Sequence, residues 1–230
     1  MLIKLKMSVV KNFTADNAFF FNQNVCMEQK ISKPTKERLI KLVRLLEQIE
    51  LQGKETVSSA EIQQRTGWTS FTIRRDISAL PDKCSNTSGY KVSALKEEIC
   101  RYLNLNECKK RCCIVGLGKL GEALINYKGF ESSVFEIKAG FDVNVNRTET
   151  LRSKFPLYST SKMETVIRQE GIEFAILAVP ESSAQETALR LSAAGIKGIV
   201  NYTSAILHLP ETTAVQNLSI IDALQNLASR

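Results

Sequence analysis

Residues 111–121, Arg-Cys-Cys-Ile-Val-Gly-Leu-Gly-Lys-Leu-Gly, decide the fold of this 230-residue chain. The last six follow the pattern G-x-G-x-x-G, directly after an apolar run and directly before a helix-like run. In that order, Gly116 makes a tight turn, Gly118 lets backbone N–H groups approach a pyrophosphate, and Gly121 lets the helix pack against the strand. We therefore predict a dinucleotide-binding loop, made of Gly116, Leu117, Gly118, Lys119, Leu120 and Gly121.

The segments after the motif supply its context, because three glycines in six positions also occur in ordinary turns. Ser133 to Asp142 is predicted to be a second strand. Phe174 to Pro180 is predicted to be a buried strand, followed by a helix at 182–194 and a strand at 197–202. Alternating strands and helices indicate a parallel sheet with crossover helices, so we expect a Rossmann-type doubly wound domain.

Three further residues belong to the predicted cofactor site. Asp142 lies about 20 residues past the last glycine, where a carboxylate bonds the ribose hydroxyls of the adenosine half. A carboxylate there also repels a 2′-phosphate, so NAD(H) is favoured over NADP(H). Val179 and Pro180 end a strand at the carboxyl edge of the sheet, which is where such folds bind ligands.

The region before the motif predicts helices. Apolar residues recur at helical spacing between Pro34 and Gly53 and predict a first helix with one buried face, made by Leu39, Leu42, Val43, Leu46 and Ile49. Ser58 and Glu61 have the spacing of a capping box and predict a short second helix that runs to Arg65, before the break at Gly67. A third, basic helix is predicted to start at Thr69.

This order of helices is typical of a helix-turn-helix unit, whose third helix enters the major groove by its N-terminal part. Gly89 to Val92 can form the wing hairpin of a winged helix, and Ala94 to Leu105 is predicted to be a connecting helix. Hydroxyls and guanidinium groups can contact phosphates or base edges. The candidate DNA-binding residues are Ser58, Thr69, Ser70, Thr72, Arg74 and Arg75.

Composition narrows the classes of function. The formal net charge of +7 favours acidic partners such as nucleic acid. The N-terminus has no signal-like apolar run and the chain no run of membrane-spanning length, so we expect a cytoplasmic protein without a membrane partner. The chain has a single histidine, His208, so the sequence offers little support for histidine-based catalysis or a His-rich metal site. We therefore predict no catalytic and no metal-binding residues.

The six cysteines form no paired C-x-x-C pattern, and Cys112 and Cys113 are adjacent in a presumed strand where their side chains face opposite ways. We interpret them as reduced core thiols. A redox role for Cys84 or Cys108 stays open.

From about Pro34 to Leu227 the chain resembles the bacterial redox-sensing transcriptional repressors of the Rex family. The segments that carry the resemblance are Arg38-Leu39-Ile40, Val57-Ser58-Ser59, Ile73-Arg74-Arg75-Asp76, Gly89-Tyr90, Gly116 to Gly121, Phe141-Asp142-Val143, Ala178-Val179-Pro180 and Ala194 to Asn201. The resemblance implies a homodimer that binds double-stranded operator DNA and is released from it by NADH. We expect four parts in the chain: a poorly ordered extension (1–33), a winged helix (34–106), a Rossmann domain (107–219) and a short C-terminal helix (220–230), which the resemblance implies is exchanged between subunits.

The resemblance also assigns roles to single residues. Tyr127 matches the family tyrosine near the nicotinamide, and Arg44 matches its arginine partner at the domain interface. Ser219 stands where the family has an aspartate from the exchanged segment, which removes a charge-assisted bond to Arg44. In the wing, Asn86 replaces a basic residue and Pro81 a glycine, which removes a DNA contact.

Two other classes of protein remain as alternatives. One is an NAD-dependent oxidoreductase with a basic N-terminal domain, for which the chain offers few catalytic groups. The other is a CoA- or nucleotide-binding module of the same Rossmann lineage. Steady hydride transfer from a common metabolite would indicate the oxidoreductase, and competition of bound NADH by CoA but not by NAD⁺ would indicate the CoA module.

Overall fold

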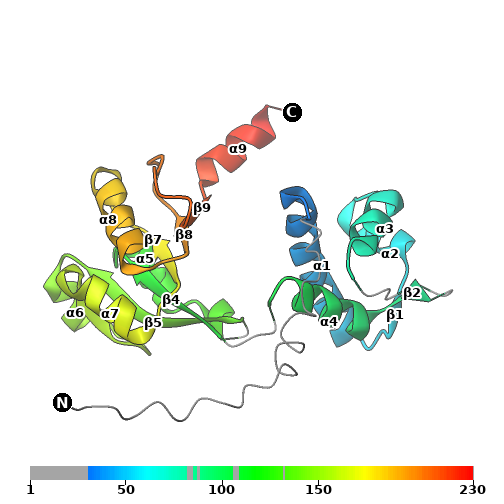
Figure 1. Ribbon diagram of the computed structural model, residues 1–230, viewed down its shortest axis with the longest axis horizontal. Helices are drawn as coiled ribbons and strands as arrows, with labels where there is room; N and C mark the ends of the chain where they lie inside the picture. The colour runs from blue at the N-terminus through cyan, green and yellow to red at the C-terminus, as the bar shows by residue number, and fades with distance from the viewer. Residues whose placement is uncertain (1–30, 82–84, 87–88, 106–108, 132, 230) are drawn as a thin grey trace, which may run out of the picture. The chain divides into compact units, whose positions relative to one another are not determined.

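The computed structural model describes residues 31–81, 85–86, 89–105, 109–131 and 133–229, and of residues 85 and 86 only the backbone (Figure 1). The predictions about residues 1–30, Cys84, Cys108 and the Asn86 side chain therefore lie outside the described residues. The chain divides into two compact units, the first ending at Leu105. No helix in the described segments is both long and apolar enough to cross a membrane.

The described part of the first unit has four helices and a small sheet. Its elements are α1 (Lys33–Leu51), β1 (Thr56–Val57), α2 (Ser59–Thr66), α3 (Ser70–Ser78), β2 (Ser85–Asn86), β3 (Gly89–Lys91) and α4 (Val92–Tyr102). Ser32 caps α1 by accepting the Thr35 N–H at 3.4 Å. The predicted stripe of α1 is buried in the core of this unit, with residues of the other three helices.

The helix-turn-helix and its wing are confirmed. Ser58 caps α2 by accepting the Glu61 N–H at 3.1 Å, and Thr69 caps α3 by accepting the Thr72 N–H at 3.2 Å. The turn between them begins at Gly67, which has φ +75°, a conformation that favours glycine. Strands β2 and β3 pair antiparallel as the wing hairpin, and β1 pairs with the other edge of β3.

The second unit is a doubly wound α/β domain. Its elements are β4 (Lys110–Val115), α5 (Lys119–Ile125), η2 (Lys128–Phe130), β5 (Phe135–Asp142), α6 (Val145–Thr150), β6 (Leu157–Ser159), η3 (Thr160–Lys162), α7 (Met163–Glu170), β7 (Phe174–Leu177), α8 (Glu181–Ala194), β8 (Gly198–Asn201), β9 (Ala214–Asn217) and α9 (Ile220–Ala228). The strands pair in parallel in the order β6-β5-β4-β7-β8-β9. The strand order reverses between β4 and β7, which is where such folds bind their ligand.

Two apolar cores cover the two faces of this sheet. Cys113 and Val115 of β4 face the core that α7 and α8 complete, whereas Ile114 faces the core that contains Ile125 of α5. Cys112 and Cys113 are both buried and free, so the prediction of reduced core thiols is confirmed for this pair. Burial raises the pKa of Cys112 to about 12, so its thiol stays protonated and unreactive at neutral pH.

The structure corrects some predicted boundaries. Strand β5 begins at Phe135 rather than Ser133, because the Ser133 hydroxyl bonds the carbonyl oxygens of Phe130 and Phe135 in a turn. Strand β7 ends at Leu177 rather than Pro180, and the chain leaves the sheet toward α8. Helix α4 begins at Val92, earlier than predicted, and ends at Tyr102.

Candidate functional site

Two glycines of the loop are required by the fold itself. Gly116 has φ +93°, and a Cβ there would lie 2.4 Å from the Ala178 carbonyl oxygen. A Cβ on Gly121 would lie 2.0 Å from the Gly116 carbonyl oxygen. Side chains at these positions would separate β4 from β7 and α5 from the loop, as the sequence pattern predicts.

Gly118 is different. Its φ of −64° suits any residue, and a Cβ there would meet only an Arg147 guanidinium nitrogen at 3.6 Å, an ordinary contact. The protein therefore does not itself require glycine at this position. The open space beside it is what a pyrophosphate needs, with the first amides of α5 as donors, since these have no intrahelical partner.

Asp142 does more than the sequence indicated. It is buried, and its Oδ2 accepts the Leu117 N–H at 2.7 Å while Oδ1 accepts the Asn144 N–H at 2.7 Å. The carboxylate thus braces the glycine loop against the end of β5. Because a carboxylate offers about four acceptor sites, acceptor capacity remains for ribose hydroxyls.

A cleft of about 520 Å³ opens at the carboxyl ends of β4, β5 and β7. Its volume falls in the range of small-molecule and cofactor pockets. Its lining is Gly116, Gly118, Asp142, Val143, Asn144, Arg147, Thr160, Ala178, Val179, Pro180, Ser183, Thr187 and Arg190. The cleft therefore brings together five of the predicted cofactor residues.

Of the other predicted loop residues, Leu117 is buried in the core beneath the loop, and Lys119 and Leu120 are exposed. None of the three is among the residues that line the cleft. The prediction that they hold a pyrophosphate therefore concerns their backbone, in the loop and in the first turn of α5, rather than their side chains. The Leu117 N–H is already engaged by Asp142.

Sequence reasoning missed the polar residues of the cleft. Ser183, Thr187 and Arg190 follow one face of α8 at intervals of four and three, a periodicity visible in the sequence. Arg147 comes soon after Asp142, with Nη1 3.7 Å from Oδ2. Its side chain is half exposed, so it is a cation available at the Asp142 end of the cleft.

Arg190 is already paired. Its Nε donates to Glu164 Oε1 at 2.6 Å and its Nη2 to Glu164 Oε2 at 3.1 Å, and Nη2 also donates to the Thr160 carbonyl at 2.8 Å. The hydrogen bond from Arg190 lowers the pKa of Glu164. Arg190 therefore ties α8 to α7 and η3 and leaves Arg147 as the less committed of the two cations.

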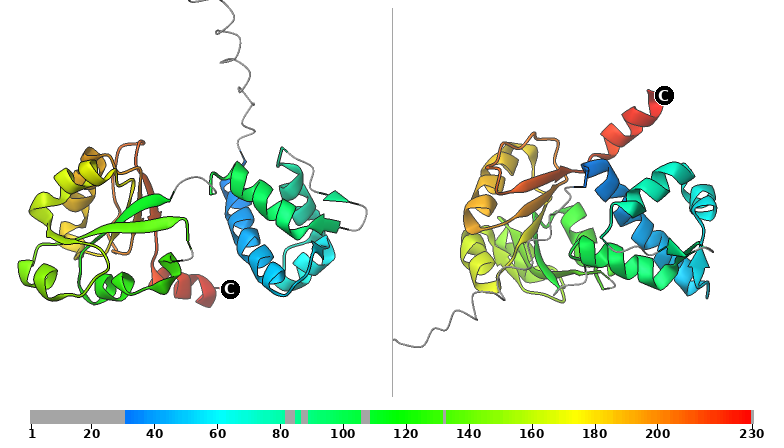
Figure 2. Two further views of the ribbon diagram at one scale, coloured as in Figure 1. Left: turned by 90° about the horizontal axis from the view of Figure 1, so that it is seen from below. Right: turned by 45° about the vertical axis from the view of Figure 1, so that its right-hand side comes forward.

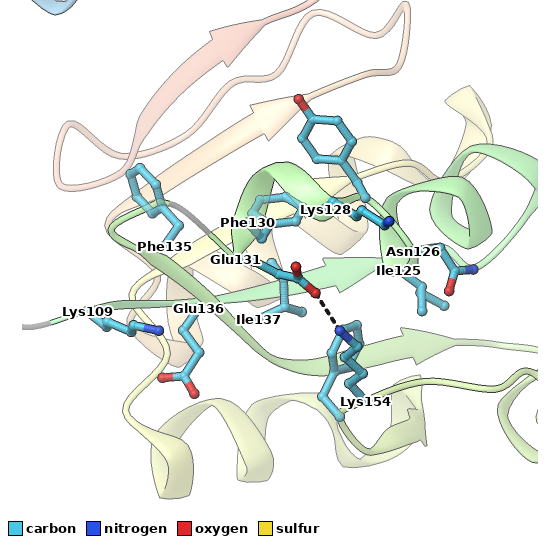
Figure 3. Close-up of a pocket in the computed structure, with 12 residues that line it drawn as sticks. Lys109, Ile125, Asn126, Lys128, Phe130, Glu131, Phe135, Glu136, Ile137 and Lys154 are labelled. Atoms are coloured by element: carbon cyan, nitrogen blue, oxygen red, sulfur yellow. Dashed lines mark hydrogen bonds and ion pairs between the residues drawn. The ribbon is translucent and has the colours of Figure 1, made fainter. Parts of the chain in front are cut away.

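Tyr127 lines a second pocket, of about 500 Å³, which shares no lining residue with the cleft. Figure 3 is a close-up of this second pocket. The Tyr127 ring is 60% exposed and meets Phe130 edge-on, with centroids 5.6 Å apart. Lys154 reaches across this pocket to Glu131 at 2.5 Å (Figure 3). The role of Tyr127 at the nicotinamide stays a prediction.

Five of the six predicted DNA-binding residues lie on α3 or at its N-cap, whereas Ser58 is the N-cap of α2. Arg74 and Arg75 are exposed, and Arg74 Nε donates to the Ser70 carbonyl at 3.2 Å. Thr69 and Thr72 share a hydrogen bond of 2.9 Å between their hydroxyls. Ser70 bonds Gln63 Oε1 at 2.7 Å, so its hydroxyl joins α3 to α2.

Arg44 and Ser219, the other two residues to which the resemblance assigns a role, lie in different units of the chain. Arg44 is exposed on α1. Ser219 is the N-cap of α9 and accepts the Asp222 N–H at 3.0 Å. Asp222 is thus in the first turn of α9, where its charge suits the helix dipole.

The fold and the cleft define a class of protein: a winged-helix DNA-binding unit joined to a Rossmann unit that binds a nucleotide cofactor. Two family models match the chain: "putative DNA-binding protein N-terminus" at residues 30–78 and "CoA binding domain" at residues 107–205. The redox-sensing transcriptional repressor Rex of Lactobacillus gasseri is 38% identical over 87% of this chain and 93% of its own length. Rex 1 of Enterococcus faecalis is 36% identical over 87% of this chain and 92% of its own.

Solved structures of a Rex-family repressor are also similar to this chain. RSP, a Rex-family repressor, in complex with β-NAD⁺ and operator DNA has a TM-score of 0.80 and 30% identity, over 87% of this chain and 92% of that one. RSP in complex with β-NADH has a TM-score of 0.78 and 30% identity, over 87% and 94% of the two chains. The chain belongs to the Rex family of redox-sensing transcriptional repressors. These proteins are regulators rather than enzymes.

Proposed function

We propose that this protein represses transcription in the cytoplasm by binding operator DNA through α3 and the wing, and that NADH in the cleft releases it. The observation that carries the cofactor half is Gly118, whose missing side chain serves no contact within the protein. Two solved complexes of RSP, one with β-NAD⁺ and operator DNA and one with β-NADH, support the pairing of the two ligands. We further propose that the protein carries out no reaction on the cofactor.

The mechanism is a linkage between two binding sites. If NADH prefers one arrangement of the dimer and DNA another, each ligand weakens the binding of the other by the same factor. A tenfold effect requires the two arrangements to differ by only about 1.4 kcal/mol in their preference for NADH. A free-energy difference of this size lies within the usual range of coupling between two binding sites.

We expect NADH to weaken binding to an operator duplex by about tenfold or more, and NAD⁺ to leave it strong. The measurement is fluorescence anisotropy with a labelled duplex selected from a randomised pool. Salt is held fixed throughout, because electrostatic affinity for DNA changes steeply with salt. Equal affinities in NAD⁺ and NADH would contradict the proposal.

The match to a CoA-binding family model defines one alternative, a CoA-binding module, which competition for the cleft can test. Bound NADH is displaced by NAD⁺ if the cleft is a redox sensor, and by CoA but not NAD⁺ if it is a CoA module. Steady hydride transfer to a metabolite would instead indicate an oxidoreductase. NADH fluorescence follows all three outcomes.

We also propose a homodimer in which α9 packs on the partner subunit. Helix α9 follows the edge strand β9 and extends away from the sheet (Figure 2), and none of its described residues is buried. Its exposed apolar side chains, at helical spacing, are Ile220, Ile221, Leu224 and Leu227. Exposed apolar surface of this extent favours burial against another chain.

Within this dimer, we expect Ser219→Asp to increase the response of DNA binding to NADH by up to about fivefold, because a carboxylate there restores the charge-assisted bond to Arg44. The Asp222 N–H keeps its cap, since Asp caps helices as well as Ser. Ser219→Asn is the matched control, because it caps without a charge. An unchanged NADH response in the Asp variant would count against the pairing of Ser219 with Arg44.

A further inference from the structure

An aromatic ring projects from the recognition helix. Phe71, the second residue of α3, is 71% exposed. Arg74, Arg75 and Ser78 are also exposed, and with Phe71 they have the spacing of a single helix face. The opposite face of α3 is buried through Ile73, Asp76 and Ile77.

Exposure alone carries no conclusion, because single apolar side chains are common on protein surfaces. The position of Phe71 is what matters. It lies one turn N-terminal to Arg74 and Arg75, and the N-terminal part of this helix is the part that reaches base edges in the major groove. The neighbouring hydroxyls of Ser70 and Thr69 are bonded to Gln63 and Thr72.

We propose that Phe71 reads a thymine in the operator by packing its ring against the 5-methyl group. This inference rests on the proposed binding of α3 to operator DNA. Thymine is the base that presents a methyl group in the major groove, and a phenyl ring, which has no hydrogen-bond donor or acceptor, suits that surface. Arg74 and Arg75 supply the contacts to phosphates or guanine, and Phe71 supplies preference at one base pair.

The first experiment compares duplexes recovered from a randomised pool by the wild-type protein and by Phe71→Ala. We expect the wild type to recover sites with a thymine at one position where the Phe71→Ala pool shows no preference. On the wild-type duplex, Phe71→Ala is expected to weaken binding at least about fivefold, the lower limit for the loss of readout at one base pair. Leu51→Ala, a truncation of an exposed apolar side chain at the end of α1, is the matched control and is expected to bind as the wild type does.

The second experiment removes only the methyl group. Deoxyuridine replaces each thymine of the selected duplex in turn, and wild-type affinity is expected to fall about fourfold at one position, the value of one buried methyl group. The same replacement should have no effect on Phe71→Ala, because the contact is then already absent. If every deoxyuridine duplex binds the wild type like its thymine parent, the thymine contact is wrong.

The outcomes separate this inference from the proposed function. If the wild type recovers no duplex from the pool, DNA recognition as a whole is rejected. If both proteins recover duplexes and the base preference of Phe71→Ala equals that of the wild type, only the role of the ring is rejected. A change in the oligomeric state of Phe71→Ala by sedimentation, with base preference intact, would assign Phe71 to a protein contact and also overturn the inference. Thermal unfolding should be unchanged in this variant, since the ring is exposed.

Discussion

Gly121→Ala is expected to lower NADH affinity by more than about a hundredfold and to destabilise the second unit by about 3 kcal/mol. The added Cβ would lie 2.0 Å from the carbonyl oxygen of Gly116 and 2.9 Å from its carbonyl carbon. Both atoms belong to backbone, so no side chain can rotate to relieve the overlap. The helix α5 must move away from the loop, and the amides that face the pyrophosphate move with it.

The measurement is NADH fluorescence titration together with thermal unfolding. Gly118→Ala is the matched variant, because its Cβ meets only the far end of the Arg147 side chain. We expect it to unfold at the wild-type temperature and to bind NADH about tenfold more weakly, since the methyl group occupies ligand space. If Gly118→Ala binds NADH as the wild type does, the pyrophosphate does not lie on this loop.

Asp76→Ala is expected to lower the free energy of unfolding of the first unit by about 2–3 kcal/mol and to abolish operator binding. Asp76 is buried, and its carboxylate accepts from Arg38 Nε at 2.5 Å, Arg38 Nη2 at 2.9 Å and the Thr35 hydroxyl at 3.1 Å. These bonds join α3 to α1. Their loss leaves the Arg38 charge without its partner and frees the recognition helix to shift.

Chemical denaturation and operator titration together measure this effect. Glu50→Ala is the matched control, because Glu50 of α1 pairs with Lys96 of α4 at the surface. Exposed pairs contribute about 0–1 kcal/mol, so this control should unfold and bind DNA almost as the wild type does. If both variants lose the same amount of unfolding free energy and of operator affinity, the link between α1 and α3 has no special role.

The helices and their ends were predictable from the sequence for a local reason. The stripe of α1, the caps Ser58 and Thr69 and the turn at Gly67 depend on residues within about four positions of each other. The alternation of strands and helices likewise predicted the parallel sheet. Boundaries such as the start of β5 were wrong by two residues, because Ser133 takes part in a turn that the β-rich pattern does not reveal.

The cleft was only partly predictable. Asp142 and Gly118 follow a motif, whereas Thr160 and Arg147 reach the cleft because parallel strands bring their carboxyl ends to one edge of the sheet. The pairing of Arg190 with Glu164, which leaves Arg147 as the more available cation, depends on the packing of α8 against α7.

The order of the two units, the glycine loop and the recognition helix could thus be predicted from the sequence alone, because each is recognised by the spacing of residues that lie near one another in the chain. The motif had already predicted that Gly116 and Gly121 serve the fold and that Gly118 leaves room for a ligand. The tertiary structure identified the atoms behind these roles, since an added Cβ at the first two positions would meet the carbonyl oxygens of Ala178 and Gly116. It also decided that Asp142 holds the loop through the Leu117 N–H and that Phe71 stands exposed beside the arginines of α3. These properties depend on atoms that lie close in space and far apart in the chain, or on which face of a helix the core buries, and a local sequence pattern specifies neither.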